Sequence, residues 1–340
     1  MLTQEQTESL FKVLNESAKT LEGVLQTSYL DAFIETGNNL LNGGEVQIED
    51  GLPSEKTVKE LQTLYSEADY RQMDAESVRR AIQLCMLAAI KDDDIQANHQ
   101  LTPDTLAYIM GYLVSRIEKD RSHLTILDPA VGTGNLLTAV INQLKPVVAG
   151  EIDGFGIDND DTLLSVAGIS AAMQRLSVDL VHQDAMETMM VKKADLIVSD
   201  LPIGYYPIDE NVVNFDTHAE SGHSYVHHLF LEQSVKQLVD GGIGVFLVPA
   251  QLFQSEESAG LLKWMQSSAY LQGLLTLPSE LFINASARKS ILILQKSGNG
   301  AKQAKKVMLG EFPSFKDQEA FQKFIAEIVQ WEERTLLSDH

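Results

Sequence analysis

The sequence predicts an α/β protein with a Rossmann-like, seven-stranded, mostly parallel sheet and a helical amino-terminal domain. Residues 3–90 space their apolar side chains three and four apart, as helices do, and residues 102–296 alternate short apolar runs with helical stretches. A glycine-containing turn joins the first of those runs to a helix. The expected division is a helical domain over residues 1–95, an α/β domain over 96–297, and a linker with a carboxy-terminal helix over 298–340.

The amino-terminal region is expected to consist of amphipathic helices. Leu10, Val13 and Leu14 are spaced so that they share one helical face, and residues 71–90 predict one long helix. Glycine pairs and a Gly-Leu-Pro sequence within residues 37–53 predict turns or a short hairpin. Cys85 is the single cysteine, so no intramolecular disulfide can form. Its side chain is expected in the core.

The α/β region is expected to contain seven strands, because seven short apolar runs are separated by turns or helical stretches. These runs cover residues 125–127, 153–157, 177–182, 196–199, 243–249, 271–277 and 290–295. Residues 297–306 are rich in glycine and lysine and predict a flexible connection. Residues 317–337 predict a helix that packs on the body of the protein.

Charge and hydropathy limit the classes of protein. The 340 residues carry a formal net charge of −22, which repels polyanions and disfavours nonspecific nucleic-acid binding unless a basic partner subunit supplies the contacts. The amino terminus lacks the basic start and apolar core of a signal peptide, and no apolar run approaches the roughly 18 residues of a membrane span. A cytoplasmic location without membrane contact is therefore expected.

A nucleotide-binding loop is expected where the first strand ends, in the sequence Leu127-Asp-Pro-Ala-Val-Gly-Thr-Gly-Asn-Leu136. Gly132 and Gly134 allow a tight turn that brings a ligand close to the backbone. The dinucleotide fingerprint requires a third glycine where this chain has Leu137, and the Gly-Lys-Ser/Thr of a P-loop is absent. A nicotinamide enzyme and a P-loop enzyme are therefore disfavoured.

Three acidic residues are expected at the carboxyl ends of successive strands. Asp128 ends the first strand, Asp158 the second and Asp184 the third. A carboxylate at the second position can accept hydrogen bonds from both ribose hydroxyls, and one at the third can accept a hydrogen bond from an adenine amino group. Each acid alone is equally well explained as a helix cap or turn residue, but the three together favour an adenosine-containing ligand.

In this region the chain resembles class I S-adenosylmethionine-dependent methyltransferases, and among them adenine-N6 DNA methyltransferases of the type I modification-subunit kind. Its loop is similar to their motif Asp-Pro-Ala-Cys-Gly-Ser-Gly, with Val131 replacing the cysteine. Residues 101–110 resemble their Thr-Pro helix, and residues 277–282 and 289–296 their late Leu-Pro-x-x-x-Phe and closing-strand segments. The implied cofactor is S-adenosyl-L-methionine. The residues expected to bind it are Thr102, Asp128, Ala130, Val131, Gly132, Thr133, Gly134, Asn135, Leu136, Asp158, Asn159, Asp184, Ala185 and Asp200.

The resemblance also implies a catalytic segment at the end of the fourth strand, where the family carries Asn-Pro-Pro-Phe/Tyr. The corresponding residues here, expected to be catalytic, are Asp200, Leu201, Pro202 and Ile203. The Asp200 carboxylate and the Leu201 carbonyl oxygen are expected to accept hydrogen bonds from an amino group and aim its lone pair at the sulfonium methyl. Ile203 stands where the family has an aromatic ring that stacks on a flipped base.

A substrate pocket is expected around this segment. Tyr205 or Tyr206 is a candidate replacement for the missing ring. Arg288 and Lys289 lie near the pocket's late strand, where they could meet an anionic substrate. His223 is expected at the lip of the pocket. It and His227 are four residues apart on an expected helix, a spacing compatible with metal ligation, but no further ligand accompanies them and no metal is expected.

The predicted function is transfer of a methyl group from S-adenosyl-L-methionine to an amino nitrogen. Adenine in DNA is the acceptor that the resemblance implies, with a partner subunit supplying recognition. A protein or small-molecule methyltransferase is an alternative, because the negative charge would attract a basic protein. A noncatalytic cofactor-binding interaction protein is another, because the catalytic segment departs from the family pattern.

Overall fold

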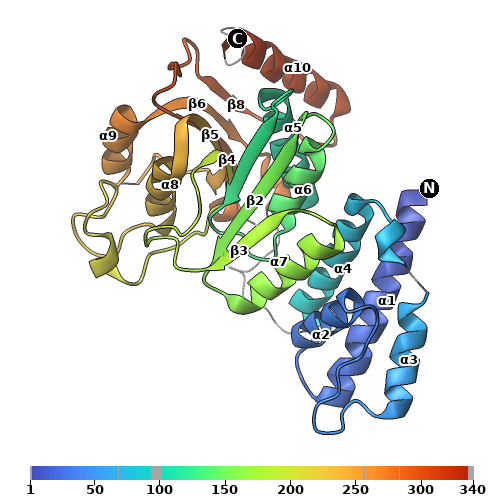
Figure 1. Cartoon of the computed structure of the whole chain (residues 1–340). Helices are drawn as coiled ribbons and strands as arrows, with labels where there is room; N and C mark the ends of the chain where they lie inside the picture. Colours follow the sequence, from blue (N-terminus) through green and yellow to red (C-terminus); the bar gives the residue numbers. More distant parts are fainter. Residues whose placement is uncertain (1, 68, 93–101, 256, 283, 336–340) are drawn as a thin grey trace.

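The computed structural model describes residues 2–67, 69–92, 102–255, 257–282 and 284–335. A group of helices from the amino-terminal part lies beside one end of a long sheet, and the carboxy-terminal helix lies at the opposite end (Figure 1). The amino-terminal elements are α1 (Leu2–Leu25), α2 (Tyr29–Leu41), α3 (Glu55–Tyr65), η1 (Tyr70–Gln72) and α4 (Ala75–Asp92).

Helices α1–α4 form their own hydrophobic core. Ser28 and Ser54 cap α2 and α3, each accepting a hydrogen bond from a backbone N–H three residues later, which satisfies a donor that the helix leaves unpaired. The core also takes in Val166, Ile169 and Met173 from α7 (Asp161–Met173), so the helical part packs on the α/β part. The expected domain boundary between residues 95 and 96 lies outside the described residues, and the division stays a prediction.

The break expected from residue 37 onward begins later in the structure. Helix α2 continues through Gly37 to Leu41, and the turn follows at Gly43 and Gly44, both of which have positive φ. The absence of a side chain at Gly37 allows α7 to lie against α2, since an added Cβ would meet the Ile169 side chain at 2.6 Å. This glycine therefore serves close helix packing rather than a turn.

The sheet has eight described strands, one more than expected, in the order β3-β2-β1-β4-β5-β7-β6-β8. Strand β7 is antiparallel to both neighbours, and the other pairs are parallel. The bounds are β1 (His123–Asp128), β2 (Glu151–Asp158), β3 (Val178–His182), β4 (Ala194–Asp200), β5 (Leu238–Pro249), β6 (Ala269–Thr276), β7 (Lys289–Lys296) and β8 (Met308–Glu311).

Two strand predictions differ from the structure by more than two residues. Strand β8 was not expected because its four residues alternate between half-buried and exposed and form no apolar run; it lies at the edge of the sheet, paired with β6. Strand β5 begins five residues earlier than expected. Gly241 has a positive φ inside this strand, a conformation that glycine adopts readily.

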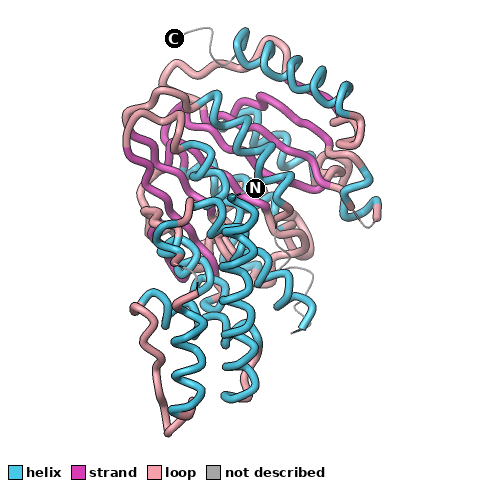
Figure 2. Tube along the Cα trace, turned by 90° about the vertical axis from the view of Figure 1, so that its right-hand side faces the viewer, coloured by secondary structure: helices cyan, strands magenta, loops and turns pink. Residues whose placement is uncertain are grey.

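Helices cover both faces of the sheet (Figure 2). Alternate residues of the central strands enter two different cores: Ile291 and Ile293 of β7 pack in one, and Leu292 and Leu294 in the other. The first core contains residues of α5 and α6, and the second contains residues of α8 and α9. The remaining elements are α5 (Asp104–Ile117), α6 (Asn135–Leu144), η3 (Asp209–Val212), α8 (Val226–Gln237), α9 (Ser258–Ser268), η4 (Ser279–Leu281), η5 (Ala285–Ala287) and α10 (Gln318–Thr335).

Helix α10 packs on the body of the protein, as expected. Ile328 is fully buried in the first core, and the Trp331 indole donates a hydrogen bond to the Lys306 carbonyl oxygen at 2.7 Å. The last two residues of the expected helix, 336 and 337, lie outside the described residues. Among the helices that the structure describes, none is long and apolar enough to cross a membrane.

Candidate functional site

The site lies at the carboxyl ends of the parallel strands. Strands β1, β2 and β4 end at Asp128, Asp158 and Asp200, and Asp184 follows β3 by two residues. The chain runs outward from β1 to β3 on one side of the sheet and from β4 to β5 on the other, so the order reverses between β1 and β4. Open α/β sheets bind ligands at such a reversal. The four acids follow four neighbouring strands at this point.

The glycine loop turns as its sequence predicts. Gly132 and Gly134 have φ of +51° and +76°, a region that glycine enters without penalty. The Val131 N–H donates to the Ile157 carbonyl oxygen at 2.9 Å, which ties the loop to the end of β2. Gly134 precedes α6, and an added Cβ there would meet the Ala167 Cβ at 3.2 Å. The loop is therefore held closely between β2 and α7.

Asp158 holds the same loop through its carboxylate. One oxygen accepts a hydrogen bond from the Gly132 N–H at 2.8 Å, and the other from the Asp160 N–H at 3.1 Å. A carboxylate has about four acceptor positions, so this one can accept a further hydrogen bond, as from a ribose hydroxyl. Burial raises the pKa of Asp158, although the backbone hydrogen bonds oppose this. This half-buried carboxylate lies where the sequence predicts ribose binding.

Asp128 is buried and accepts a hydrogen bond from the glycine loop. Its Oδ1 accepts hydrogen bonds from the Ser199 hydroxyl at 2.6 Å and the Ala130 N–H at 3.1 Å. Burial raises its pKa to about 7, with further contributions from the neighbouring acids Asp158 and Asp200. The Ser199 bond links the end of β1 to β4, next to residues 200–203, which the resemblance predicts to be catalytic and which we call the catalytic segment. In this structure Asp128 acts through its neighbours.

Asp184 is joined to one of the two tyrosines considered for the substrate pocket. Its carboxylate accepts a hydrogen bond from the Tyr206 hydroxyl at 2.5 Å and another from the Met186 N–H at 2.9 Å. Burial, and then the bond to Asp184, raise the pKa of Tyr206 to about 12. The Tyr206 ring is buried in the core with Phe215 and Leu201, so it is not free to stack on a substrate.

The other expected cofactor residues differ in exposure. The half-buried ones are Ala130, Gly132 and Thr133, and Asn159 is exposed. The buried ones are Thr102, Val131, Gly134, Asn135, Leu136 and Ala185. Buried residues of this set can reach a ligand only through their backbone or through a neighbour.

Asp200 is held from two sides. One carboxylate oxygen accepts a hydrogen bond from the Thr102 hydroxyl at 3.1 Å, and the other forms an ion pair with the Lys289 ammonium. The backbone that follows is fixed as well, since the Leu201 N–H donates to the Leu247 carbonyl oxygen of β5 at 3.1 Å. Pro202 is half-buried, and Ile203 is 45% exposed.

An exposed pair of stacked rings follows the catalytic segment. The Tyr205 side chain is 58% exposed and stacks on Tyr225, with 4.8 Å between ring centroids and 17° between ring planes. The Tyr225 ring also contacts the rings of His227 and His228. Of the two tyrosines considered as replacements for the missing ring, Tyr205 is the one accessible to a substrate. Sequence analysis did not identify Tyr225, which is twenty residues away.

The expected helical pair of His223 and His227 does not form, because α8 begins at Val226 and leaves His223 in the preceding loop. His223 is exposed and pairs with Asp209 at 2.9 Å. His227 is buried, and burial lowers its pKa to about 3. Within the part of the chain that the structure describes, no group of three or more His, Cys, Asp or Glu side chains is arranged to hold a metal.

Arg288 contacts residues at the neighbouring edge of the sheet. Its Nε donates to the Leu277 carbonyl oxygen at 2.7 Å, and its Nη2 forms an ion pair with Glu311 of β8. Its place in a substrate pocket stays a prediction. The adjacent Lys289 is the residue that reaches the catalytic segment.

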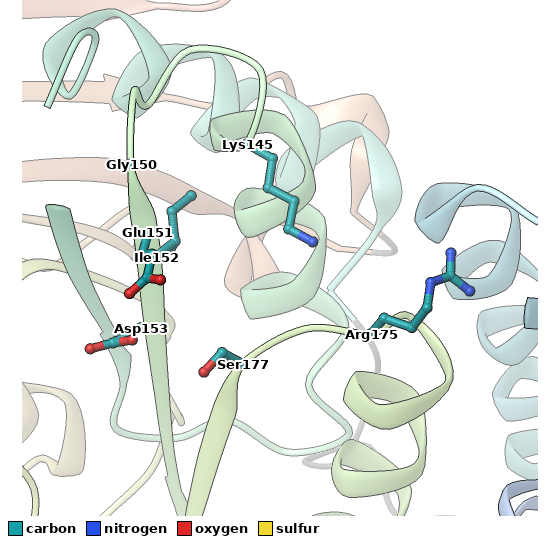
Figure 3. Close-up of a pocket in the computed structure, with 7 residues that line it drawn as sticks. All are labelled: Lys145, Gly150, Glu151, Ile152, Asp153, Arg175 and Ser177. Atoms are coloured by element: carbon teal, nitrogen blue, oxygen red, sulfur yellow. The ribbon is translucent and has the colours of Figure 1, made fainter. Parts of the chain in front are cut away.

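A separate hollow of about 350 Å³ lies at the opposite end of the strands (Figure 3). It is lined at the amino-terminal ends of β2 and β3 by Glu151 and Ser177, with Lys145 and Arg175 nearby. Because β2 runs from Glu151 to Asp158, this hollow is separated from the glycine loop by the length of that strand. It does not belong to the site described above.

A buried arginine connects the helical part to the site. Arg79 of α4 is 1% exposed and donates to the Asn135 side chain at 2.5 Å and to Asp104 at 2.9 Å. Asn135 in turn donates to the Thr102 carbonyl oxygen at 3.0 Å. Thr102 contacts Asp200, so a chain of hydrogen bonds runs from α4 to the catalytic segment. Sequence analysis missed Arg79 because nothing in the local pattern marks it.

Together, the sheet order, the glycine loop and the acids at the strand ends define a class I S-adenosylmethionine-dependent methyltransferase fold. The profile of the N-6 DNA methylase family matches residues 92–330, and that of the YtxK N-terminal helical domain matches residues 8–90. The chain belongs to the N-6 DNA methylase family.

Three relatives show how similar the chain is to known proteins. The chain is 38% identical to the uncharacterized protein YtxK of Bacillus subtilis over 95% of this chain and 96% of the relative. A crystal structure of a candidate class I S-adenosylmethionine-dependent methyltransferase from Listeria monocytogenes is 39% identical, with a TM-score of 0.89 over 96% and 99% of the two chains. The methyltransferase subunit of a type I restriction-modification system from Streptococcus thermophilus shares the fold at 13% identity and a TM-score of 0.65, over 97% and 88%.

Proposed function

We propose that this protein transfers a methyl group from S-adenosyl-L-methionine to an amino nitrogen held at Asp200. One observation carries the proposal: Asp200 ends β4, directly beside the strand that enters the glycine loop, and both of its carboxylate oxygens are fixed by polar contacts. A fixed acceptor of hydrogen bonds at this point can orient a nitrogen toward a methyl donor bound along β1 and β2.

The residues around the loop fit the cofactor. A Cβ added to Gly132 would meet nothing within 4 Å, so the space beside the loop backbone is open. Asp158 can accept a further hydrogen bond, as from a ribose hydroxyl, and Asp184 is half-buried next to it in the strand order. When bound, S-adenosyl-L-methionine supplies a methyl group activated by its sulfonium charge.

The chain's own residues would orient the acceptor. The Asp200 carboxylate and the Leu201 carbonyl oxygen would each accept a hydrogen bond from the amino group, which directs the nitrogen lone pair away from both. Thr102 holds the carboxylate in place, and the hydrogen bond from the Leu201 N–H to Leu247 holds the backbone. Little reorganisation is then needed at the moment of transfer.

The acceptor and any partner are part of the proposal. The family supports adenine in DNA, and the Streptococcus thermophilus relative is itself a subunit of a larger system. With a net charge of −22, this chain would engage DNA only where a partner subunit supplies basic contacts.

The test uses methyl-tritiated S-adenosyl-L-methionine, purified protein and a lysate from cells that lack it. We expect counts in a macromolecular fraction with the wild type, and a loss of at least about a hundredfold with Asp200→Ala, which removes the acceptor oxygens. Calorimetry should find similar cofactor affinity in both proteins. Equal loss of binding and turnover in the variant would contradict the role of Asp200. Tight binding without turnover on any fraction would instead support a noncatalytic interaction protein.

A further inference from the structure

Lys289 and the glycine loop lie on opposite sides of strand β4, which ends at Asp200. The glycine loop and the acids for the cofactor follow β1, β2 and β3, on one side of β4. Lys289 begins β7 on the other side, where it pairs with Pro249 at the end of β5. Its side chain therefore approaches Asp200 from the half that the cofactor residues do not occupy. This is the half left for the methyl acceptor.

The contact that Lys289 makes is the one proposed for the acceptor. An amino nitrogen at the end of a flexible alkyl chain donates to the Asp200 carboxylate. Both side chains are largely enclosed, with 20% of Lys289 and 18% of Asp200 exposed. The site thus accommodates an alkylammonium group and its hydrocarbon stem.

The strength of the contact between Lys289 and Asp200 limits which acceptor amines can displace the Lys289 ammonium from the carboxylate. Charge-assisted hydrogen bonds are roughly twice as strong as neutral ones. A neutral ring amine that displaced the lysine would exchange a charged contact for a weaker one, whereas another alkylammonium would exchange like for like. The flat-ring site of the family is also altered, because Ile203 replaces the aromatic residue and Tyr206 is bound to Asp184. The accessible Tyr205 ring is itself stacked on Tyr225.

The surface around the catalytic segment has the charge that attracts cations. Residues 200–231 contain five acidic residues and no lysine or arginine. The exposed acids among them are Asp209, Glu210, Asp216 and Glu220. Exposed apolar side chains lie in the same segment, at Ile203, Tyr205, Ile208 and Val213. Such a surface repels a phosphate backbone and favours a basic polypeptide with apolar residues.

We propose that the Lys289 ammonium occupies the position of the acceptor nitrogen, and that the acceptor which displaces it is a primary alkylamine: a lysine side chain of a basic protein. The inference rests on the proposed methyltransferase function and specifies its acceptor. Lys289 is then a specificity-determining residue, since it fills the site unless a like-charged group replaces it.

Methyl transfer to such an acceptor requires an unprotonated nitrogen. The bound ammonium loses one proton through the Asp200 carboxylate to water, which frees the nitrogen lone pair. That lone pair forms the new bond to the methyl carbon of S-adenosyl-L-methionine. The bond from sulfur to that carbon breaks, and its electron pair stays on sulfur as S-adenosylhomocysteine. The product is a methylated ammonium group.

The test removes the Lys289 amine from the site by substitution and supplies a small amine in solution to take its place. Lys289→Ala removes the three outer carbons and the nitrogen, which n-propylamine replaces. At pH 9.5, near the ordinary pKa of about 10.4 for a lysine amine, part of the propylamine is neutral. With S-adenosyl-L-methionine, we expect Lys289→Ala to form N-methylpropylamine at least about tenfold faster than the wild type, by mass spectrometry. That difference is about 1.4 kcal/mol in activation free energy.

Two variants control this measurement. Lys289→Met keeps the pocket filled without the charge and should form no more product than the wild type. Asp200→Ala added to Lys289→Ala should abolish the gain. If Lys289→Ala binds the cofactor as tightly as the wild type but methylates propylamine no faster than Lys289→Met, the inference is overturned.

A measurement on the wild type covers the case in which Lys289→Ala does not fold. The protein is incubated with S-adenosyl-L-methionine and either a lysine-rich peptide or adenine-containing duplex DNA. We expect methyl-lysine in the peptide. N6-methyladenine in the DNA with an unmodified peptide would overturn the acceptor class and leave the proposed function intact. Absence of cofactor binding would overturn both, and binding without either product would overturn the inference.

Discussion

The Lys289 ammonium and the Asp200 carboxylate form an ion pair across the end of strand β5. The pair joins the first residue of β7 to the last residue of β4, two strands that are separated in the sheet by β5. With Thr102 on the other carboxylate oxygen, it fixes the orientation of Asp200 before any ligand binds. A carboxylate held in this way suits catalysis by positioning, because its orientation need not be acquired during the reaction.

The buried Arg79 is expected to stabilise the fold and to support the site. Arg79→Met removes the cation that pairs with Glu76 and Asp104 and leaves both acids without it, which should cost about 3–5 kcal/mol in urea denaturation. Methyl transfer by the folded fraction should also fall, because Asn135 loses its donor. Arg80→Met, at the more exposed neighbour, should cost less than about 1 kcal/mol. Equal losses in the two variants would contradict this assignment.

Asp158 is expected to govern cofactor affinity. Asp158→Asn removes the charge and replaces one acceptor oxygen with a donor NH2 group, so cofactor binding should weaken by about 1.5–3 kcal/mol, or roughly 10–100-fold in Kd. Calorimetry with S-adenosyl-L-methionine measures this directly. Asp160→Asn, at the residue that caps α7, is the matched control and should bind normally. Unchanged affinity in Asp158→Asn would remove this residue from the cofactor site.

Gly134 is expected to be sensitive to any side chain. Its φ of +76° and its approach to Ala167 both oppose a Cβ, so Gly134→Ala should destabilise the protein by about 1–2 kcal/mol or more. Gly23→Ala is the contrasting substitution. An added Cβ at this position in α1 meets nothing within 4 Å, and the change should stabilise the protein by about 0.4–1 kcal/mol. Urea denaturation distinguishes the two signs, and stabilisation by Gly134→Ala would be evidence against this loop geometry.

His227 is expected to make the protein sensitive to acid. Burial lowers its pKa to about 3, with the His228 ring adding to the effect, while an unfolded chain has the ordinary value of about 6.5. Between these values the unfolded chain binds a proton that the folded protein does not, so stability is lost as pH falls from 6.5 toward 3.

The measurement is the difference in unfolding free energy between wild type and His227→Phe at pH 7.5, 6 and 5. The variant should lose less stability on acidification, by up to about 1.4 kcal/mol per pH unit below 6.5. His182→Gln, at an exposed position on β3, is the control and should follow the wild type. Parallel pH profiles for wild type and His227→Phe would show that His227 does not contribute.

The features that the sequence predicts well are those encoded within a few neighbouring residues. Helical spacing identifies the amino-terminal helices, and apolar runs identify seven of the eight strands. The conformation of the glycine loop follows from Gly132 and Gly134. The edge strand β8 escapes prediction because it is short and half exposed. The length of α2 was also not predicted, because Gly37 suggests a turn in the sequence but serves close packing against α7 in the structure.

The sequence by itself therefore determined the α/β class, the glycine loop and the acids at the strand ends, because spacing and turn chemistry are local properties of the chain. Only the tertiary structure decided which partners those acids have. Lys289 meets Asp200 from 89 residues away, and Arg79 meets Asn135 from 56 residues away. Such pairs depend on strand order and helix packing, which bring distant segments together in ways that local patterns do not record.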